Sequence, residues 1–180
     1  MTGRIYAVVG PSGAGKDTLM AALKDRRPDL CFVRRVITRP TEAGGEDFDG
    51  ITEDLFAARA ARGDFALSWQ AHGLSYGIPA AVNALLDEGR DVLFNGSRAI
   101  LPKARQVFPA LRVIHVTAPI PVLAERLEKR GRETRAQIAK RLERAVYQMP
   151  GDLPVTVICN DGSVGQAVEA LEAALQPESV

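Results

Sequence analysis

Residues Gly10-Pro11-Ser12-Gly13-Ala14-Gly15-Lys16 follow directly on the apolar run Ile5–Val9 and open a segment of helical period, Lys16–Arg26. The pattern G-x-x-x-x-G-K between a strand and a helix is typical of a loop that binds nucleotide phosphates. Its glycines let successive backbone N–H groups point inward, and the start of the helix adds partial positive charge. The lysine adds a mobile ammonium for the β- and γ-phosphates. We therefore expect an ATP site formed by Gly10, Pro11, Ser12, Gly13, Ala14, Gly15 and Lys16, with Lys16 acting in catalysis.

The positions after Lys16 decide how a magnesium ion is held. The usual next residue is Ser or Thr, but here it is Asp17, followed by Thr18. The strand in which an acidic metal partner is expected, Asp91 to Asn95, ends in an amide. We interpret this as one acidic group lost there and one gained in the loop, so we predict that Asp17 and Thr18 bind Mg²⁺. The alternative is that Asp17 only suits the first turn of a helix, where negative charge is favourable.

Strands and helices are predicted to alternate along the chain, which favours an α/β fold with a parallel sheet covered on both faces. The segment 39–79 breaks this alternation and indicates an insertion with a small sheet of its own, with strand-like pieces around Trp69 and Tyr76 and one short helix near 52–62. The expected strands are Ile5–Val9, Phe32–Thr38, Val92–Phe94, Arg112–Thr117 and Val155–Cys159. The expected helices are Lys16–Arg26, Ala80–Glu88, Arg98–Val107, Pro121–Lys129, Arg135–Gln148 and Val164–Leu175.

The composition is that of an ordinary globular domain: 180 residues, 46% hydrophobic and 25% charged. The formal net charge of +1 argues against a nucleic-acid partner. Cys31 and Cys159 lie far apart without a C-x-x-C spacing, which indicates neither a disulfide framework nor a zinc site, and we expect them to be small side chains that face the core in a reducing compartment. The short apolar start is neither a signal peptide nor a membrane span, so we expect a cytoplasmic protein with no membrane partner, either a monomer or a homodimer.

Basic residues concentrate in 125–144, which holds eight Lys or Arg and four Glu. A solvated helical surface with ion pairs between successive turns accounts for some of them. Arg130-Gly131-Arg132 differs, because the glycine interrupts the helix and lets both arginines reach a polyphosphate.

The chain resembles the guanylate kinase branch of the nucleoside monophosphate kinases over nearly its whole length. The resemblance implies one P-loop kinase domain with a three-layer α/β fold, divided into a core (1–38, 80–128 and 136–180), an acceptor-binding insertion (39–79) and a lid (129–135). It also implies transfer of the γ-phosphoryl group of ATP to a phosphate, with Mg²⁺. The matching pieces are Gly10–Leu19, Ile37-Thr38-Arg39, His72–Gly77, Arg126-Leu127, Arg130-Gly131, Arg141-Leu142 and Asn160-Asp161.

The departures from that family concern the acceptor. In guanylate kinases a Ser and a Glu read the guanine edge, and here Arg35 and Leu67 stand at those positions. Leu67 cannot accept hydrogen bonds from a base, whereas Arg35 offers a fork suited to a phosphate. The acceptor-binding Tyr of the family corresponds to Phe48, and the second Arg of its T-T-R-x-P-R motif is missing. We therefore expect that GMP is not the preferred acceptor.

These departures fit a neighbouring family, the ribose 1,5-bisphosphate phosphokinases of bacterial phosphonate degradation. The similarity rests on Gly10–Asp17, Ile37–Pro40, Phe65–Trp69, Gly73–Gly77, Asn95–Arg98 and Asn160–Ser163. It implies that ribose 1,5-bisphosphate and ATP become 5-phosphoribosyl 1-pyrophosphate (PRPP) and ADP, so that the partner is a small sugar phosphate. Two alternatives stay open: a nucleoside monophosphate kinase with altered base choice, and a non-catalytic binding module of the same fold.

The resemblance also implies roles for individual side chains. Arg130, Arg132 and Arg141 are expected to neutralise the transferring charge as the lid closes. Asn160 and Asp161 are expected at the adenine pocket, although a turn followed by a helix cap is an equal alternative for Asn160–Ser163. The residues expected to bind the acceptor are Arg35, Arg39, Tyr76, Asn95 and Arg98, with a cap by Ser97 as the alternative for the last pair.

Overall fold

The computed structural model describes the chain except for residues 1, 12, 146–148, 150 and 177–180. The described chain forms two compact units. The first consists of residues 1–7 and 28–112, and the second consists of residues 8–27 and 113–180.

The larger sheet confirms the expected α/β architecture. Its strands are β1 (Ile5–Val9), β2 (Cys31–Phe32), β7 (Val92–Asn95), β8 (Arg112–Thr117) and β9 (Val155–Cys159), in the order β2-β7-β1-β8-β9. β2 pairs with β7 in parallel in the first unit, and β8 pairs with β9 in parallel in the second. All five residues of β1 are buried, as expected for a strand that is covered on both faces.

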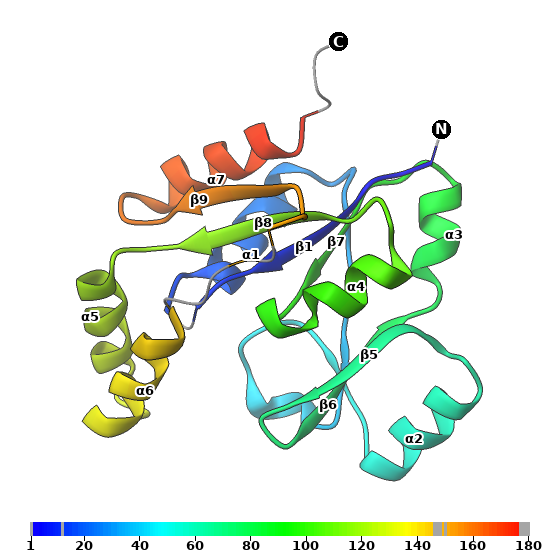
Figure 1. The fold of residues 1–180 in the computed structure, drawn as a ribbon, viewed down its shortest axis with the longest axis horizontal. Helices are drawn as coiled ribbons and strands as arrows, with labels where there is room; N and C mark the ends of the chain where they lie inside the picture. The colour runs from blue at the N-terminus through cyan, green and yellow to red at the C-terminus, as the bar shows by residue number, and fades with distance from the viewer. Residues whose placement is uncertain (1, 12, 146–148, 150, 177–180) are drawn as a thin grey trace. The chain divides into compact units, whose positions relative to one another are not determined.

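Two of the four helices described in the second unit carry an expected signal at one end. α1 (Lys16–Arg26) packs against α7 (Val164–Ala174), and α5 (Ile120–Arg130) packs against α6 (Arg135–Ala145) (Figure 1). Gly131, at φ 61°, ends α5 in the left-handed conformation, which confirms the predicted break between two arginines. Ser163 and Gln166 form a capping box at the start of α7, so the cap expected there is present.

The smaller sheet lies in the first unit. It contains β3 (Val36–Ile37), β4 (Asp49–Gly50), β5 (Phe65–Ala71) and β6 (Leu74–Pro79), in the order β4-β3-β6-β5. β5 and β6 form an antiparallel hairpin, and β5 packs against α2 (Glu53–Ala61), where the Phe56 and Phe65 rings stack with centroids 4.6 Å apart. The Thr52 hydroxyl caps α2 by accepting a hydrogen bond from the Leu55 N–H. The insertion's own sheet is therefore confirmed.

The remaining helices of the first unit are short. They are η1 (Thr41–Ala43), α3 (Val82–Asp87), η2 (Arg98–Ile100) and α4 (Leu101–Val107), where η marks a 3-10 helix. The helix expected from Arg98 thus begins as a 3-10 turn, with Pro102 within the first positions of α4. Ser97 precedes η2 without a side-chain cap, so its alternative role as a cap is wrong.

The expectation of one strand over Phe32–Thr38 is wrong. The chain forms β2 in the larger sheet, leaves it, and forms β3 in the smaller sheet. Arg34 and Arg35 lie between the two strands, and each pairs with a carboxylate of residues 46–49. Arg35 is buried and needs its carboxylate partner, which lies outside the larger sheet, so the chain leaves that sheet before β3 begins. The smaller sheet therefore begins before the expected boundary at residue 39.

Two further expectations are tested within the described residues. Helix α6 is described to Ala145, and residues 146–148 of the expected helix lie outside the described residues. Cys31 and Cys159 are free thiols, with Cys31 half-buried and Cys159 exposed, so the expectation that Cys159 faces the core is wrong. Among the residues that the structure describes, no helix has the length and apolarity needed to cross a bilayer.

Candidate functional site

The nucleotide loop connects the end of β1 to α1 in the second unit, as the sequence predicts. A Cβ on Gly10 would lie 2.0 Å from the carbonyl oxygen of Val116, so only glycine fits there. Gly15 has φ 88°, a conformation that L side chains avoid, and a Cβ there would lie 2.5 Å from Asn160 Nδ2. Ser12, also predicted to bind ATP, lies outside the described residues. Gly10 and Gly15 are thus required by the shape of the loop.

The loop and the start of α1 present positive charge. Gly15 is the N-cap of α1 and makes no side-chain cap, so amides of the first turn stay available to an anion. Lys16 Nζ donates to the carbonyl oxygen of Gly10 at 3.0 Å, which holds the ammonium against the loop. This arrangement suits a polyphosphate.

Two side chains hold the loop by its backbone carbonyls. Asn160 is 5% exposed, and its Nδ2 donates to the Ala14 oxygen at 2.8 Å. Arg126, on α5, donates through Nη1 to the Gly13 oxygen at 3.0 Å and through Nη2 to the Asn160 oxygen at 2.7 Å. The side-chain amide of Asn160 is thus bonded to the loop. Arg126, to which the sequence motifs assign no role, holds both the loop at Gly13 and the chain at Asn160.

The predicted magnesium ligands lie in the first turn of α1, where Asp17 and Thr18 are both exposed. Among the described residues no group of three His, Cys, Asp or Glu side chains is arranged to hold a metal. Mg²⁺ in nucleotide sites takes one or two protein oxygens and completes its shell with water and phosphates. A single carboxylate with a neighbouring hydroxyl fits that requirement.

The predicted lid arginines differ in their surroundings. Arg130 and Arg132 flank Gly131, and both are exposed. Neither side chain forms a hydrogen bond or an ion pair with the rest of the described chain. Arg141, on α6, pairs with Glu133, whose Oε1 lies 2.9 Å from Nη2. The other oxygen of Glu133 is buried and has no partner among the described residues. The first two arginines are therefore available to an anion, whereas the third is held by a carboxylate.

In the first unit, Arg35 is buried and paired. Its residue exposure is 8%, and its Nε donates to Glu46 Oε2 at 3.0 Å while Nη2 donates to Glu46 Oε1. Asn95, at the end of β7, also approaches Glu46 Oε2, with its Nδ2 3.5 Å away. The structure thus brings Arg35 and Asn95, two of the predicted acceptor residues, to one carboxylate, and the fork of Arg35 is occupied by that carboxylate.

An aromatic pair supports the same arginine. Trp69 and Tyr76 face each other across the β5–β6 hairpin, and their rings stack with centroids 5.4 Å apart and planes 8° apart. The Arg35 guanidinium carbon lies 4.9 Å from the centre of the Tyr76 ring and 5.9 Å from that of Trp69. Cation–π attraction therefore holds the guanidinium on a second side. The predicted residue Tyr76 contacts Arg35 through its ring.

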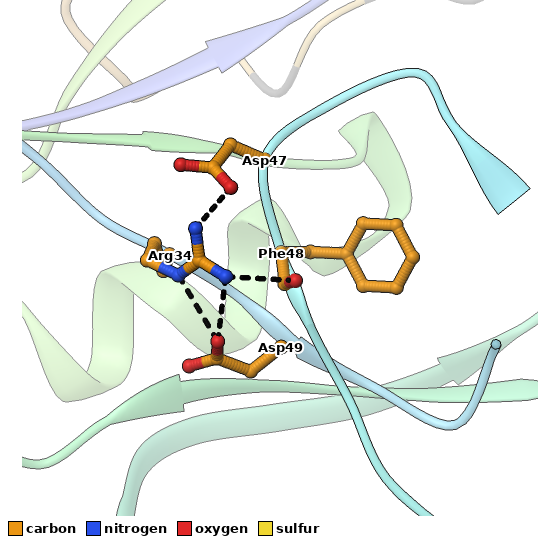
Figure 2. A network of polar contacts seen from close by, with 4 residues as sticks. All are labelled: Arg34, Asp47, Phe48 and Asp49. Atoms are coloured by element: carbon orange, nitrogen blue, oxygen red, sulfur yellow. Dashed lines mark hydrogen bonds and ion pairs between the residues drawn. The ribbon is translucent and has the colours of Figure 1, made fainter. Parts of the chain in front are cut away.

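The preceding arginine has a structural role. Arg34 is exposed and donates to Asp47 and Asp49, with Nη2 2.8 Å from Asp49 Oδ1, and to the carbonyl oxygen of Phe48 at 3.1 Å (Figure 2). The side-chain hydrogen bonds to Asp49 and then Asp47 raise the pKa of Arg34 above its ordinary value. Arg34 thus fixes the 47–49 segment next to Glu46.

Arg39 and Arg98 complete the predicted acceptor residues. Arg39 donates to the carbonyl oxygen of Gly44 at 3.1 Å and lies over the Phe48 ring, 4.3 Å from its centre. Its Nε is buried without a partner in the described part of the chain. Phe48, where the resembled family has a tyrosine, is 2% exposed and supports Arg39 by its ring alone. Arg98 begins η2 and is half-buried.

Sequence reasoning missed the carboxylates that hold the arginines. Glu46 stands in an acidic, glycine-rich stretch that has no helical or strand period, so nothing in its spacing assigns it to Arg35. Glu133 precedes Thr134, which caps α6, and nothing in its spacing along the sequence assigns it to Arg141. The available signal was chemical: a buried arginine requires a carboxylate partner.

Comparison with known proteins identifies the family. The guanylate kinase family model matches residues 2–178. A protein of Agrobacterium fabrum named ribose 1,5-bisphosphate phosphokinase PhnN is 49% identical, with 96% of each chain covered. A protein of the same name from Thiobacillus denitrificans is 46% identical, covering 94% of this chain and 90% of that relative.

Solved structures agree on the fold. A guanylate kinase from Anaplasma phagocytophilum superposes with a TM-score of 0.65 at 18% identity, covering 97% of this chain and 85% of that one. A sugar kinase from a Janibacter species superposes with a TM-score of 0.56 at 19% identity, covering 95% and 93%. The family model spans nearly the whole chain, and this protein therefore belongs to the guanylate kinase family.

Proposed function

We propose that this protein is a ribose 1,5-bisphosphate phosphokinase, which transfers the γ-phosphoryl group of ATP to ribose 1,5-bisphosphate and yields PRPP and ADP. The observation that carries the proposal is the pair of residues at the base-reading positions of the family. Arg35 is buried and held by Glu46, and Leu67 is 2% exposed and apolar. A purine finds no hydrogen-bond partner at Leu67, whereas an anion can meet the Nη1 edge of Arg35, because Glu46 accepts from Nε and Nη2. The relatives named as ribose 1,5-bisphosphate phosphokinases support the same reading.

The reaction joins two phosphates. An oxygen of the phosphate on C1 of the sugar attacks the γ-phosphorus, the bond from that phosphorus to the β,γ-bridging oxygen breaks, and ADP leaves with the electron pair. The second pKa of a phosphate monoester is about 6, so the attacking oxygen is already ionised at neutral pH. No general base is needed, and the difficulty is the repulsion between two polyanions. Cationic side chains are therefore the expected catalytic groups.

We assign the donor phosphates to the loop amides and to Lys16. Arg130 and Arg132 neutralise the charge on the transferring group and exclude water, which competes as an acceptor. Arg141 joins them by exchanging its contact with Glu133 for a phosphate. The adenine lies by Asp161, and Asn160 and Arg126 keep the loop in its binding shape.

We assign the acceptor to residues of the first unit. Arg35 and Arg39 bind its phosphates, and Asn95 and Arg98 orient the sugar or the second phosphate. Tyr76 acts through its ring, which fixes Arg35, and its hydroxyl is available to a phosphate oxygen. Phosphate contacts at both ends of the substrate select a bisphosphate over a nucleoside monophosphate.

The reaction uses Mg²⁺ with ATP, held by Asp17 and Thr18. The ion supplies positive charge to the β- and γ-phosphates. Because ATP is the donor, we propose a cytoplasmic location. We expect the range of acceptors to be set by the side chains that bind the acceptor, which are Arg35, Arg39, Tyr76, Asn95 and Arg98.

A panel of acceptors tests the proposal. The purified protein is incubated with ATP, Mg²⁺ and either ribose 1,5-bisphosphate, ribose 5-phosphate, GMP, AMP or UMP, and ADP release is measured. A Lys16→Met variant serves as the blank, because it lacks the ammonium that contacts the phosphates. We expect kcat/KM for ribose 1,5-bisphosphate to exceed every other value. A higher value for GMP supports a nucleoside monophosphate kinase instead, and no turnover of any acceptor supports a binding module.

A further inference from the structure

We infer that Glu46 is a positioning residue that sets the affinity for the acceptor by holding Arg35 and Asn95 in their binding geometry. The inference rests on the proposed function, which assigns Arg35 and Asn95 to the acceptor and names ribose 1,5-bisphosphate as that acceptor. Glu46 has no role in the sequence motifs described above. Its assignment follows from contacts that only the structure brings together.

The contact between Glu46 and Arg35 leaves one edge of the guanidinium available. Nε and Nη2 both donate to Glu46. Within the described residues, Nη1 makes no hydrogen bond. A guanidinium bound on its Nε side presents its Nη1 edge in a fixed direction, because the fork is planar and rigid. Glu46 thus selects which N–H groups of Arg35 meet an acceptor phosphate.

Burial makes this contact strong. The side chains of Arg35 and Glu46 are 10% and 14% exposed. In such surroundings charges are weakly screened, and the removal of one partner leaves the other uncompensated. Trp69 and Tyr76 lie against the same guanidinium and limit its movement further. An arginine fixed in this way loses little side-chain entropy when it binds a phosphate.

Asn95 connects the same carboxylate to a second predicted acceptor residue. Its Nδ2 lies 3.5 Å from Glu46 Oε2, the oxygen that also accepts from Arg35 Nε. Asn95 ends β7 of the larger sheet, whereas Arg35 lies in the segment between β2 and β3, so the two side chains come from separate segments of the first unit. Glu46 therefore holds the side chains of two predicted acceptor residues in place relative to each other.

The adjacent ion pair offers a matched control. Asp47 pairs with Arg34 at the surface, where the two side chains are 64% and 46% exposed. The substitutions Glu46→Gln and Asp47→Asn each remove one negative charge and one arginine contact, at neighbouring positions of the same segment. They differ in burial and in the arginine that they release.

The experiment compares steady-state kinetics of the wild type, Glu46→Gln and Asp47→Asn, with ribose 1,5-bisphosphate and ATP varied in turn. For Glu46→Gln we expect the KM for the sugar bisphosphate to rise about tenfold or more, as loss of a hydrogen bond to a charged group does. We expect kcat and the KM for ATP to stay close to wild type. For Asp47→Asn we expect all three constants to stay close to wild type.

A second pair of variants separates positioning from direct contact. Arg35→Lys keeps the positive charge and loses the fork. If Glu46 acts through Arg35 and Asn95, the KM of the double variant Arg35→Lys/Glu46→Gln stays well below the product of the two single effects, because the two substitutions remove one shared interaction. Multiplied effects mean that Glu46 contacts the acceptor itself, and they overturn the inference. Equal KM values for Glu46→Gln and wild type overturn it as well.

Thermal melting shows whether each variant is folded. If Glu46→Gln does not fold, Glu46→Asp replaces it in the comparison. The aspartate keeps the charge and shortens the side chain, so we expect a smaller rise in the KM for the sugar bisphosphate. An unchanged KM for Glu46→Asp then overturns the inference. If the wild type uses an acceptor other than ribose 1,5-bisphosphate, the proposed function fails, and the same comparison is made with that acceptor.

Discussion

Asn160 donates through Nδ2 to the carbonyl oxygen of Ala14 at 2.8 Å, so a buried side chain 146 positions away holds the nucleotide loop. Asn160→Asp keeps the shape but sets a carboxylate oxygen against that carbonyl oxygen. We expect a KM for ATP about tenfold higher and a loss of about 1–3 kcal/mol in the free energy of unfolding. Initial rates at varied ATP and urea denaturation measure the two effects.

The matched control for this prediction is Asn83→Asp. Asn83 lies in α3 and is exposed, so the same chemical change there leaves the ATP dependence at its wild-type value. A wild-type KM for ATP in Asn160→Asp contradicts the role of this contact in the loop.

Asp17 is the proposed carboxylate ligand of Mg²⁺. Asp17→Asn keeps the size of the side chain and removes its charge, so the Mg²⁺ concentration for half-maximal rate rises by about tenfold, the lower end of what a lost metal contact costs. Rates at varied Mg²⁺ and saturating ATP measure this. Asp25→Asn, at an exposed position of the same helix, is the control. An unchanged Mg²⁺ dependence in Asp17→Asn means that Asp17 only favours the first turn of α1.

Leu67 stands where the resembled family carries a base-reading glutamate, yet it is buried in β5. Leu67→Glu places a carboxylate in an apolar environment without a partner. We expect it to lower the free energy of unfolding by about 3–5 kcal/mol and to confer no activity on GMP. Chemical denaturation and the acceptor panel measure both. Leu67→Met, of similar volume, is expected to cost less than about 1.5 kcal/mol.

GMP turnover by Leu67→Glu would show that this position reads the acceptor even in this chain. That result contradicts the claim that the acceptor is bound through Arg35 and not through the side chain at position 67.

Cys159, at the end of β9, is expected to react slowly. Desolvation, followed by the negative charge of Asp161, raises the pKa of its thiol. A raised pKa leaves a smaller thiolate fraction at any given pH, and the thiolate is the nucleophile. Alkylation by iodoacetamide, followed by mass spectrometry across a pH series, is expected to show a midpoint above that of a cysteine peptide. Asp161→Asn lowers the midpoint, and a wild-type midpoint at or below that of the peptide contradicts the prediction.

The sequence predicts those parts of the molecule that depend on local chemistry. The nucleotide loop follows from glycines that must turn between a strand and a helix, and the end of α5 follows from Gly131, whose φ of 61° suits glycine. The alternation of strands and helices predicts the parallel sheet because each element buries its own apolar face.

The contacts that hold the charged side chains could not be predicted in this way. Glu46 meets Arg35 eleven positions away, across a segment without regular spacing, and Arg126 meets Gly13 from 113 positions away. The split of Phe32–Thr38 has the same origin, because Arg34 and Arg35 find their partners only once the 46–49 segment is in place. Pairings of this kind depend on topology, whereas the motifs depend on neighbours along the chain.

A competition between two acceptors tests the central claim most directly. The protein receives equal concentrations of ribose 1,5-bisphosphate and GMP, with Mg²⁺ and a limiting amount of ATP, and phosphorus NMR resolves the phosphates of PRPP and of GDP in one spectrum. We predict that the γ-phosphoryl group is recovered in the pyrophosphate of PRPP and that GMP remains. Recovery of that phosphoryl group in GDP, with the sugar bisphosphate unchanged, would contradict the account.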